Sequence, residues 1–224
     1  MSTESKLYWG AGIVSVLVFI GSFLLPGEPV NKADLPWNIE HPAPGATRVF
    51  GLTLGTSTTN DAEQYFREEA KISLFKSPQG VLTVEAFFEQ VNLAELKAKI
   101  VVSVAVSEAE LQGMYERGLR MSGIASGKKV TLTADDTARV RALPIAGLTY
   151  MPSVRLEEEL IGKRFGPPSQ RIREKESGAL HWLYPQHGLD ITLGSDGRPV
   201  LQYVPPGEFD KLLQPLSAGG EAIN

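Results

Sequence analysis

Arg164-Phe165-Gly166-Pro167-Pro168-Ser169 is the stretch on which the interpretation of the fold depends, because it marks where a helix must end. Over residues 156–165, apolar side chains recur at helical spacing. The consecutive glutamates at 157–159 suit the positive end of a helix dipole. Glycine followed by two prolines does not continue a helix, so the pattern predicts a helix that stops at this stretch.

Short segments with strand character follow this helix. β-Branched and aromatic residues are frequent in residues 180–184, 189–193 and 199–204. Asp196-Gly197 lies between the last two segments and is typical of a tight hairpin turn. The C-terminal part is therefore predicted to be one helix packed on a three-stranded antiparallel meander, which is an α+β unit.

A resemblance to a known family covers residues 152–206. The order Phe165-Gly166-x-Pro168, Trp182-x-Tyr184 and Asp196-Gly197 resembles the SmpA/OmlA module of the outer-membrane assembly lipoprotein family BamE, which is similar in fold to the repeats of the β-lactamase inhibitor protein. The resemblance implies a non-enzymatic, protein-binding module in the envelope of a Gram-negative bacterium. Members of that family usually hang from a lipidated cysteine, whereas this chain contains no cysteine, so its anchor is expected to differ.

The composition argues against several function classes. The chain has 224 residues, of which 42% are hydrophobic, and this suffices for a core. Its net charge of -4 is a poor match to nucleic acid, because phosphate-binding surfaces are normally basic. The absence of cysteine excludes disulfides, thiolate metal sites and cysteine nucleophiles. We expect no cofactor, no metal and no nucleic-acid partner.

Residues 7–25, from Leu7 to Leu25, form an apolar run without a charged residue. This length meets the requirement of roughly 20 residues for a helix that crosses a bilayer. The alternative is a cleaved signal peptide, although no small-residue cleavage site follows the run. Lys6 precedes it, so the positive-inside bias places residues 1–6 in the cytoplasm and the bulk of the chain in a periplasm. The sequence thus predicts a single-pass signal anchor in the inner membrane, with the lipid bilayer as one partner.

The rest of the chain divides into four predicted segments. Residues 26–46 contain five prolines and are expected to form an extended tether. Residues 47–145 are predicted to be a first α+β module and residues 146–214 the BamE-like module. Residues 215–224 are predicted to be a flexible tail.

Local signals mark individual elements inside the first module. Thr58 with Asp61, and Ser107 with Glu110, have the spacing of helix N-caps. Residues 97–106 alternate like a strand, and residues 48–54 have strand composition. These signals predict an alternation of short helices and strands.

A short repeat leaves the number of modules open. Gly51-Leu52-Thr53 and Gly147-Leu148-Thr149 each precede a predicted helix and strands. Either the two parts are tandem copies of one module, or the identity arises by chance. The fold class is accordingly predicted as α+β: an N-terminal transmembrane helix followed by one or two small helix-on-antiparallel-sheet modules of the BamE or β-lactamase-inhibitor-protein type.

Residues suited to catalysis or metal binding are few. His181, His187 and Asp190 form a cluster in the sequence, and they would bind a metal or support catalysis only if they converge. We favour the alternative in which His181 faces solvent and His187 sits in a turn. No serine-nucleophile or phosphate-loop signature is present. The sequence therefore predicts no catalytic residue and favours a protein that is not an enzyme.

Six residues are candidates for binding a partner. Arg171, Arg173 and Lys175 alternate along an extended segment and would share one face beside Trp182 and Tyr184. Such a surface fits an acidic partner or lipid head groups. The alternative is a solvated edge strand protected by charge, because glutamates alternate with the basic residues.

Trp37, in the predicted tether, is the sixth candidate. It either docks on a partner or packs on its own domain.

The sequence as a whole favours a non-catalytic adaptor. We expect an inner-membrane-anchored periplasmic adaptor or accessory subunit that binds one or more envelope or membrane proteins and supports their complex. Two alternatives stay open. One is a membrane-tethered periplasmic hydrolase with a site that only the tertiary structure assembles, and the other is an inhibitor-like protein.

Overall fold

The computed structural model describes residues 31–223, and residues 32–223 of these belong to one compact unit. The predicted tail 1–6, the predicted span 7–25 and the first residues of the predicted tether lie outside the described residues. Within the described range, no helix is long and apolar enough to cross a membrane. The predicted single-pass location in the inner membrane, with the bulk of the chain in the periplasm, is corrected on this finding.

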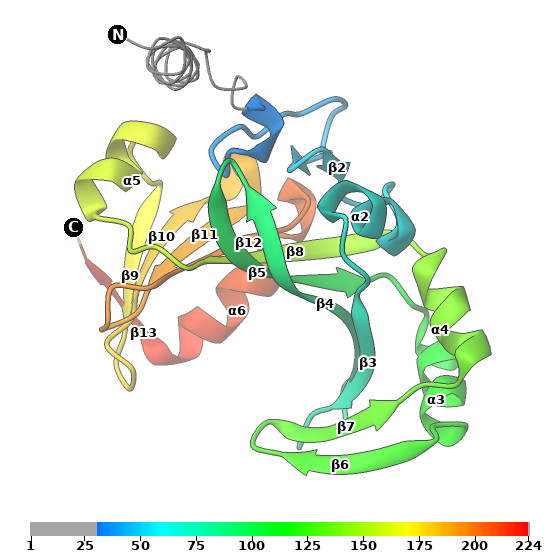
Figure 1. The fold of residues 1–224 in the computed structure, drawn as a ribbon. Coiled ribbons are helices and arrows are strands. Elements are labelled where there is room, and N and C mark those ends of the chain that lie inside the picture. The colour runs from blue at the N-terminus through cyan, green and yellow to red at the C-terminus, as the bar shows by residue number, and fades with distance from the viewer. Residues whose placement is uncertain (1–30, 224) are drawn as a thin grey trace, which may run out of the picture. The chain divides into compact units, whose positions relative to one another are not determined.

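Within residues 31–223, eleven strands join in one antiparallel sheet with the order β13-β9-β10-β11-β12-β8-β5-β4-β3-β7-β6 (Figure 1). Their bounds are β3 Lys71–Lys76, β4 Leu82–Leu93, β5 Leu96–Val104, β6 Arg120–Ile124, β7 Gly127–Thr131, β8 Ile145–Pro152, β9 Gln170–Glu174, β10 Leu180–Tyr184, β11 Leu189–Leu193, β12 Pro199–Tyr203 and β13 Gly220–Ile223.

The predicted fold class, a transmembrane helix followed by one or two small helix-on-sheet modules, is wrong. Strand β8 pairs with β5 on one side and with β12 on the other, so strands from both predicted modules share one large sheet. The physical reason is that β8 is hydrogen-bonded along both of its edges. Two separate modules would each need a sheet edge at this point.

Helices and short elements complete the described part of the chain. They are η1 Lys32–Asp34, β1 Arg48–Val49, β2 Leu52–Thr53, α2 Thr59–Phe66, α3 Glu108–Glu116, α4 Ala134–Arg141, α5 Glu158–Phe165, η2 Pro185–His187, η3 Pro206–Glu208 and α6 Asp210–Gly219, where η denotes a 3-10 helical turn.

The predicted N-caps of α2 and α3 are confirmed. Thr58 Oγ1 accepts a hydrogen bond from the backbone N–H of Asp61 at 3.2 Å, and the Asp61 carboxylate accepts from the Thr58 N–H at 2.7 Å. This is a capping box. Before α3, Ser107 Oγ accepts from the Glu110 N–H at 3.4 Å. These bonds join residues three apart, which is why sequence alone located both helix starts.

The two faces of the sheet differ in what covers them. Along β4, Val84, Ala86 and Phe88 are buried and alternate with the half-buried Glu85 and Phe87. We call the side of Val84, Ala86 and Phe88 the core face and the other side the open face. Helices α2, α3, α4 and α5 all contribute buried apolar side chains to the cluster on the core face.

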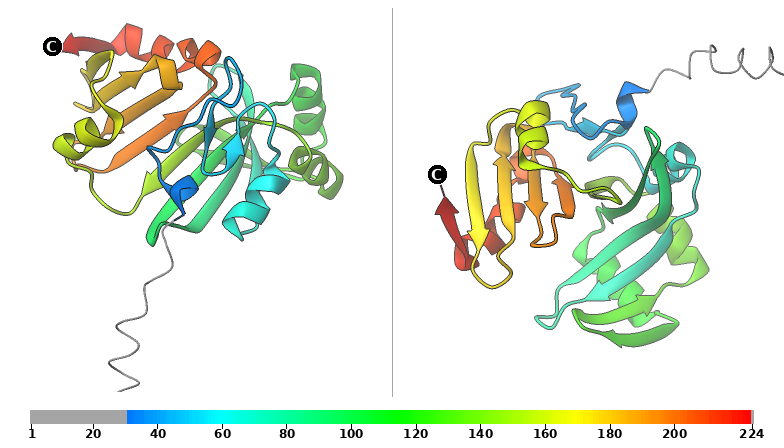
Figure 2. Two further views of the ribbon diagram at one scale, coloured as in Figure 1. Left: turned by 90° about the horizontal axis from the view of Figure 1, so that it is seen from above. Right: turned by 60° about the vertical axis from the view of Figure 1, so that its left-hand side comes forward.

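Helix α6 covers one end of the open face. Its Leu216 and the preceding Phe209 pack with Ile172 of β9 and Leu183 of β10 in a separate apolar cluster. Figures 1 and 2 show α6 beside the β9 end of the sheet, while the β6–β7 hairpin forms the opposite end. The open face is therefore left accessible over β3, β4 and β5.

The described part of the predicted flexible tail, residues 215–223, is helix and strand. Its first residues complete α6, and β13 then pairs with β9 from Gly220 opposite Glu174 to Ile223 opposite Arg171. Strand β9 has neighbours on both sides, so it is not the edge strand that the charge pattern suggested.

The described part of the predicted tether is attached to the core. The hydroxyl group of the buried Tyr203 donates a hydrogen bond to the backbone oxygen of Pro36 at 2.8 Å. Glu40 forms an isolated bridge with Arg48. This part of the chain is therefore packed and is not an extended spacer.

Candidate functional site

Two of the six predicted partner-binding residues lie in the core. Trp182 and Tyr184 are 6% and 0% exposed and belong to the cluster on the core face. The Tyr184 hydroxyl donates to the backbone oxygen of Gly166 at 3.0 Å, and burial raises the pKa of Tyr184 to about 12. The aromatic part of the predicted binding surface is therefore packed inside the protein.

The three basic candidates lie at the surface. The Arg171 guanidinium lies 5.2 Å from the centre of the Trp182 ring, so it covers the edge of the core. Arg173 and Lys175 are exposed, and Arg173 donates to the backbone oxygen of Gly178 at 3.1 Å. A basic stripe is present, but the aromatic side chains expected beside it are buried.

Trp37 packs on its own chain. Its ring meets Phe165 edge-on with 6.4 Å between ring centroids, and the Arg164 guanidinium lies 4.6 Å from the centre of the Trp37 ring. Phe165 also lies 6.0 Å from the Tyr184 ring. The six candidates therefore do not form one exposed surface.

His181 and Asp190 do converge, but inside the protein. His181 Nδ1 donates to Asp190 Oδ2 at 2.8 Å, and the two residues are 5% and 1% exposed. Thr192 Oγ1 lies 3.1 Å from the same ring nitrogen, and Glu174 Oε1 lies 3.5 Å from His181 Nε2. The prediction that His181 faces solvent is wrong.

This buried polar network lies apart from the open-face cavities. It lies on the face against which α6 packs, and it lines none of the cavities described below. Among residues 31–223, no group of three or more histidine, aspartate or glutamate side chains is arranged to hold a metal ion.

The charges of Asp190 and Glu174 determine the protonation of His181. Burial lowers the pKa of His181, but the hydrogen bond and attraction to Asp190, together with Glu174, outweigh it, so the net shift is upward. Asp190 Oδ1 has no hydrogen-bond partner among the described residues. Protonated His181 is therefore a major compensation for the buried Asp190 carboxylate.

His187 contacts His41 instead of His181. His187 Nδ1 lies 3.1 Å from His41 Nε2, and the two ring planes differ by 7°. His41 Nδ1 lies 2.9 Å from the backbone oxygen of Ala46, so this nitrogen carries the hydrogen that it donates. Burial and then the proximity of His41 lower the pKa of His187.

We expect His181→Gln to destabilise the protein most strongly at acidic pH. The folded-state pKa of His181 lies above its ordinary value of 6.5. Its protonated form therefore contributes stability that is fully present below 6.5 and is lost as pH rises through the raised pKa. Urea unfolding at a series of pH values should show the free-energy difference between wild type and variant shrinking as pH rises.

His187→Gln is the matched control. Because the pKa of His187 is lowered, its contribution is present above 6.5 and is lost as pH falls through the lowered pKa. The two variants should therefore show opposite pH trends, and parallel trends would contradict the assignment.

The open face carries accessible apolar side chains beside a carboxylate. Half-buried Phe75, Phe87 and Val101 line a cavity of about 340 Å³, and Phe87 lies directly opposite Val101. Glu85 lines the same cavity, opposite Ser73 on one side and Ser103 on the other. Burial raises the pKa of Glu85, and no ion pair within residues 31–223 offsets this cost.

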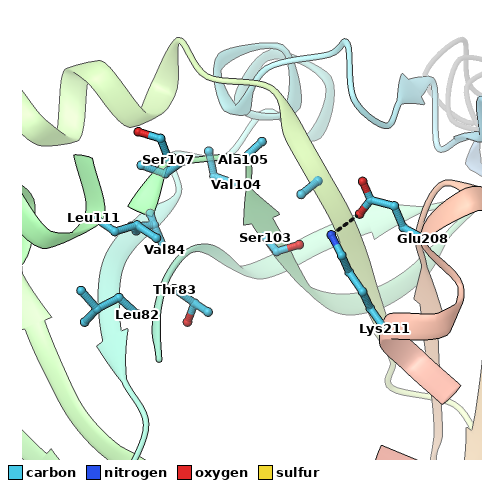
Figure 3. A pocket seen from close by; sticks show the side chains of 12 residues that line it. Leu82, Thr83, Val84, Ser103, Val104, Ala105, Ser107, Leu111, Glu208 and Lys211 are labelled. Atoms are coloured by element: carbon cyan, nitrogen blue, oxygen red, sulfur yellow. Dashed lines mark hydrogen bonds and ion pairs between the residues drawn. The ribbon is translucent and has the colours of Figure 1, made fainter. Parts of the chain in front are cut away.

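A second cavity, of about 520 Å³, lies where β4 begins and β5 ends (Figure 3). Thr83 and Ser103 line it from the sheet, and Glu208 and Lys211 line it from η3 and α6, joined by an ion pair of 2.6 Å. Its volume is within the usual range of ligand pockets. Thr83 and Glu85 are two residues apart on one strand, so the two cavities adjoin along the open face.

A third cavity, of about 420 Å³, lies over β5, β8 and β12, where Lys99, Met151 and Val200 line it. Lys99 and Val101 share one side of β5. The open face therefore carries a series of hollows from the β12 side to β7.

The open-face residues were not predicted, although the sequence contains a signal for them. Phe87 and Phe88 are adjacent, and neighbours in a strand point to opposite faces. Phe88 is fully buried and Phe87 is half-buried on the other side. If both residues lie in one strand, only one of the two rings can point to the core face and the other must point to the open face.

Comparisons with protein-family models, curated proteins and solved structures found no match. The resemblance of residues 152–206 to the SmpA/OmlA module stays a prediction. The fold and its site define a protein with a large antiparallel sheet, one face of which is covered by helices and the other only partly covered.

Proposed function

We propose that this chain is a non-catalytic binding subunit, an adaptor or accessory component that holds another protein on the open face of its sheet. The observation that carries the proposal is the accessible apolar group Phe75, Phe87 and Val101 between α6 and the β6–β7 hairpin. Protein interfaces place apolar and aromatic area of this kind at their centre.

The negative charge of Glu85 on the open face indicates which side chain the partner presents there. Half-burial of Glu85 removes water from its carboxylate, which disfavours the ionised form and raises its pKa. A Lys or Arg side chain from a partner would pair with it in the interface and offset that cost. We therefore infer a protein that presents apolar side chains to Phe87 and Val101 and a basic side chain to Glu85.

No observation favours the hydrolase alternative. It needs His181, His187 and Asp190 to meet at a pocket. In the described part of the chain, His181 and Asp190 form a buried network and His187 pairs with His41.

Phe75→Ser combined with Phe87→Ser is expected to remove the partner while leaving the fold intact, because both rings are on the open face. The test is affinity purification of the tagged full chain from the cells that produce it, with quantitative mass spectrometry. A stoichiometric partner should be recovered with wild type and lost with this variant. With the purified partner, Glu85→Lys should weaken binding by about tenfold or more, since it replaces attraction by repulsion.

The matched control is Val154→Ser combined with Leu160→Ser, which removes two exposed apolar side chains from other places. The control should retain the partner. The proposal is wrong if the open-face variant keeps its partner, or if both variants lose it equally.

A further inference from the structure

The second feature that suggests a binding surface is the edge of the sheet at β6. Strand β6 is last in the strand order and pairs only with β7. All five of its residues, Arg120–Ile124, are exposed. Half of the backbone N–H and C=O groups of an edge strand point away from the sheet, so they form a template for another strand.

Strand β6 is short and begins with the charged Arg120, but two other common protections of an edge strand, a proline and a bulge, are absent from it. It contains no proline, and its register with β7 is uninterrupted from Arg120 opposite Thr131 to Ile124 opposite Gly127. The hairpin is also held in place on β3. A Cβ atom at Gly127, where φ is +131°, would lie 2.1 Å from the backbone oxygen of Lys76, so only glycine permits this close approach.

The surroundings of β6 are basic although the whole chain is acidic. Residues 71–84 and 117–134 contain no aspartate or glutamate, whereas the net charge of the chain is -4. Lys71 is paired with Glu89, and Arg117 with Asp136. The remaining cations of these segments are Lys76, Arg120, Lys128 and Lys129, and none forms an ion pair with a described residue.

Two of these cations raise the local positive potential directly. Lys76 and Lys128 lie opposite each other on neighbouring strands and line a cavity of about 330 Å³. Like charges in this position are unfavourable. Lys76 is partly compensated by the Tyr115 ring, whose centre is 4.3 Å from Nζ. An anionic group beside the hairpin would relieve the repulsion.

The two sides of β6 have different chemistry. Met121 lies opposite the buried Val130, so it points to the core-face side, where it is 47% exposed. Ser122 lies opposite Lys129, which places Arg120, Ser122 and Lys129 on the open-face side. A strand added to β6 would meet Met121 on the core-face side, where Lys128 lies opposite Gly123. On the open-face side it would meet Arg120, Ser122 and Ile124, and Lys129 lies there opposite Ser122.

We propose that β6 accepts an extended acidic segment of another protein as a twelfth strand of the sheet, with carboxylates toward Arg120 and Lys129 and apolar side chains toward Met121. Main-chain hydrogen bonds supply affinity in this mode of recognition, and the alternation of side chains supplies specificity. The inference goes beyond the proposed function, because the added strand pairs with the backbone edge of the hairpin. Of the two cations that it would meet, Lys129 also lines the open-face cavity of about 340 Å³ and Arg120 does not.

A second copy of this chain is a poor occupant of the same edge. Pairing two β6 strands would bring Arg120 and the hairpin lysines of both copies together with no carboxylate in either hairpin. The other end of the sheet, β13, carries Glu221 on the edge strand itself, opposite Arg173 of β9. An acidic strand therefore favours β6.

The test uses the full chain and a fluorescein-labelled peptide in which Glu alternates with Val. Fluorescence anisotropy should show binding, and hydrogen exchange should show new protection of the β6 amides. A peptide of the same composition, with its Glu and Val residues in two blocks, should bind at least about tenfold more weakly, because it cannot place them on opposite sides. Arg120→Glu combined with Lys129→Glu should weaken binding of the alternating peptide by about tenfold.

The control variant is Lys163→Glu combined with Lys175→Glu, which changes net charge equally at two exposed lysines elsewhere. It should bind like wild type, and both variants should keep the wild-type melting temperature. Gly127→Ala, which displaces the hairpin from β3, should also lose binding. Three results would overturn the proposal: equal binding of the block peptide, protection elsewhere than β6, or tighter binding of phosphatidylglycerol vesicles or single-stranded DNA.

Discussion

Replacing Trp182 by alanine is expected to lower the free energy of unfolding by about 3–5 kcal/mol. The indole is 6% exposed in the core-face cluster, directly opposite Ile191, and Arg171 covers its edge. Truncation loses the buried apolar area and leaves a cavity. Strand β10 is bonded on both sides, to β9 and β11, so the neighbouring backbone cannot readily collapse into the space.

Urea unfolding followed by circular dichroism measures this effect, and two variants serve as controls. Trp182→Phe keeps a ring and removes an indole N–H that has no hydrogen-bond partner among residues 31–223, so its loss should be smaller. Leu160→Ala, at a position 37% exposed on α5, should cost less than about 1 kcal/mol. A wild-type midpoint for Trp182→Ala would show that the ring is not part of the core.

Gly188→Ala is expected to cost about 3 kcal/mol or more. Gly188 follows η2 with φ of +62°, and a Cβ atom there would lie 1.9 Å from the backbone oxygen of Val204. The obstacle is backbone, which a rotamer change cannot remove. The Val204 N–H also donates a hydrogen bond to the Gly188 oxygen at 2.8 Å. Moving the Val204 backbone away from the new Cβ atom would break this bond, which joins the turn to the end of β12.

Gly162→Ala is the matched control for Gly188→Ala. Gly162 lies inside α5, and a Cβ atom there would have no neighbour within 4 Å. Alanine should therefore stabilise the helix by roughly 0.5–1 kcal/mol. Thermal unfolding of both variants distinguishes a steric effect from a general intolerance of glycine replacement, and equal melting temperatures would contradict the steric argument.

Elements specified by neighbouring residues agreed with their sequence predictions. The capping box of Thr58 and Asp61 begins α2, and β10 and β11 have the predicted bounds. The helix before Gly166 ends at Phe165 as expected. Helix caps, helix-breaking residues and the alternation of a strand act between residues that are a few positions apart. The sequence therefore contains all the interactions that set the ends of these elements.

Residues 48–54 show where a local pattern fails. A single strand was expected, but Phe50 and Gly51 adopt positive φ values of 49° and 69° and turn the chain between β1 and β2. Phe50 is fully buried and contacts the rings of Tyr150 and Tyr203, at centroid distances of 4.9 and 6.0 Å. Packing against residues about a hundred or more positions away stabilises a backbone conformation that Phe rarely adopts.

The two copies of the Gly-Leu-Thr tripeptide occupy different structural elements. Leu52 and Thr53 belong to a two-stranded hairpin, whereas Gly147-Leu148-Thr149 lies in the middle of the large sheet. The same tripeptide therefore occurs in two different environments. The strands with which each copy pairs decide its structure, and the tripeptide does not.

The sequence by itself determined the starts of α2 and α3, the end of α5, the bounds of β10 and β11, and which side chains share a strand face. Only the tertiary structure decided that β8 joins all strands into one sheet, that α6 covers one end of the open face, and that β6 is left as a basic edge. The reason is physical: alternation places side chains on two faces, but burial of a face depends on strand pairing and helix packing between segments distant in sequence.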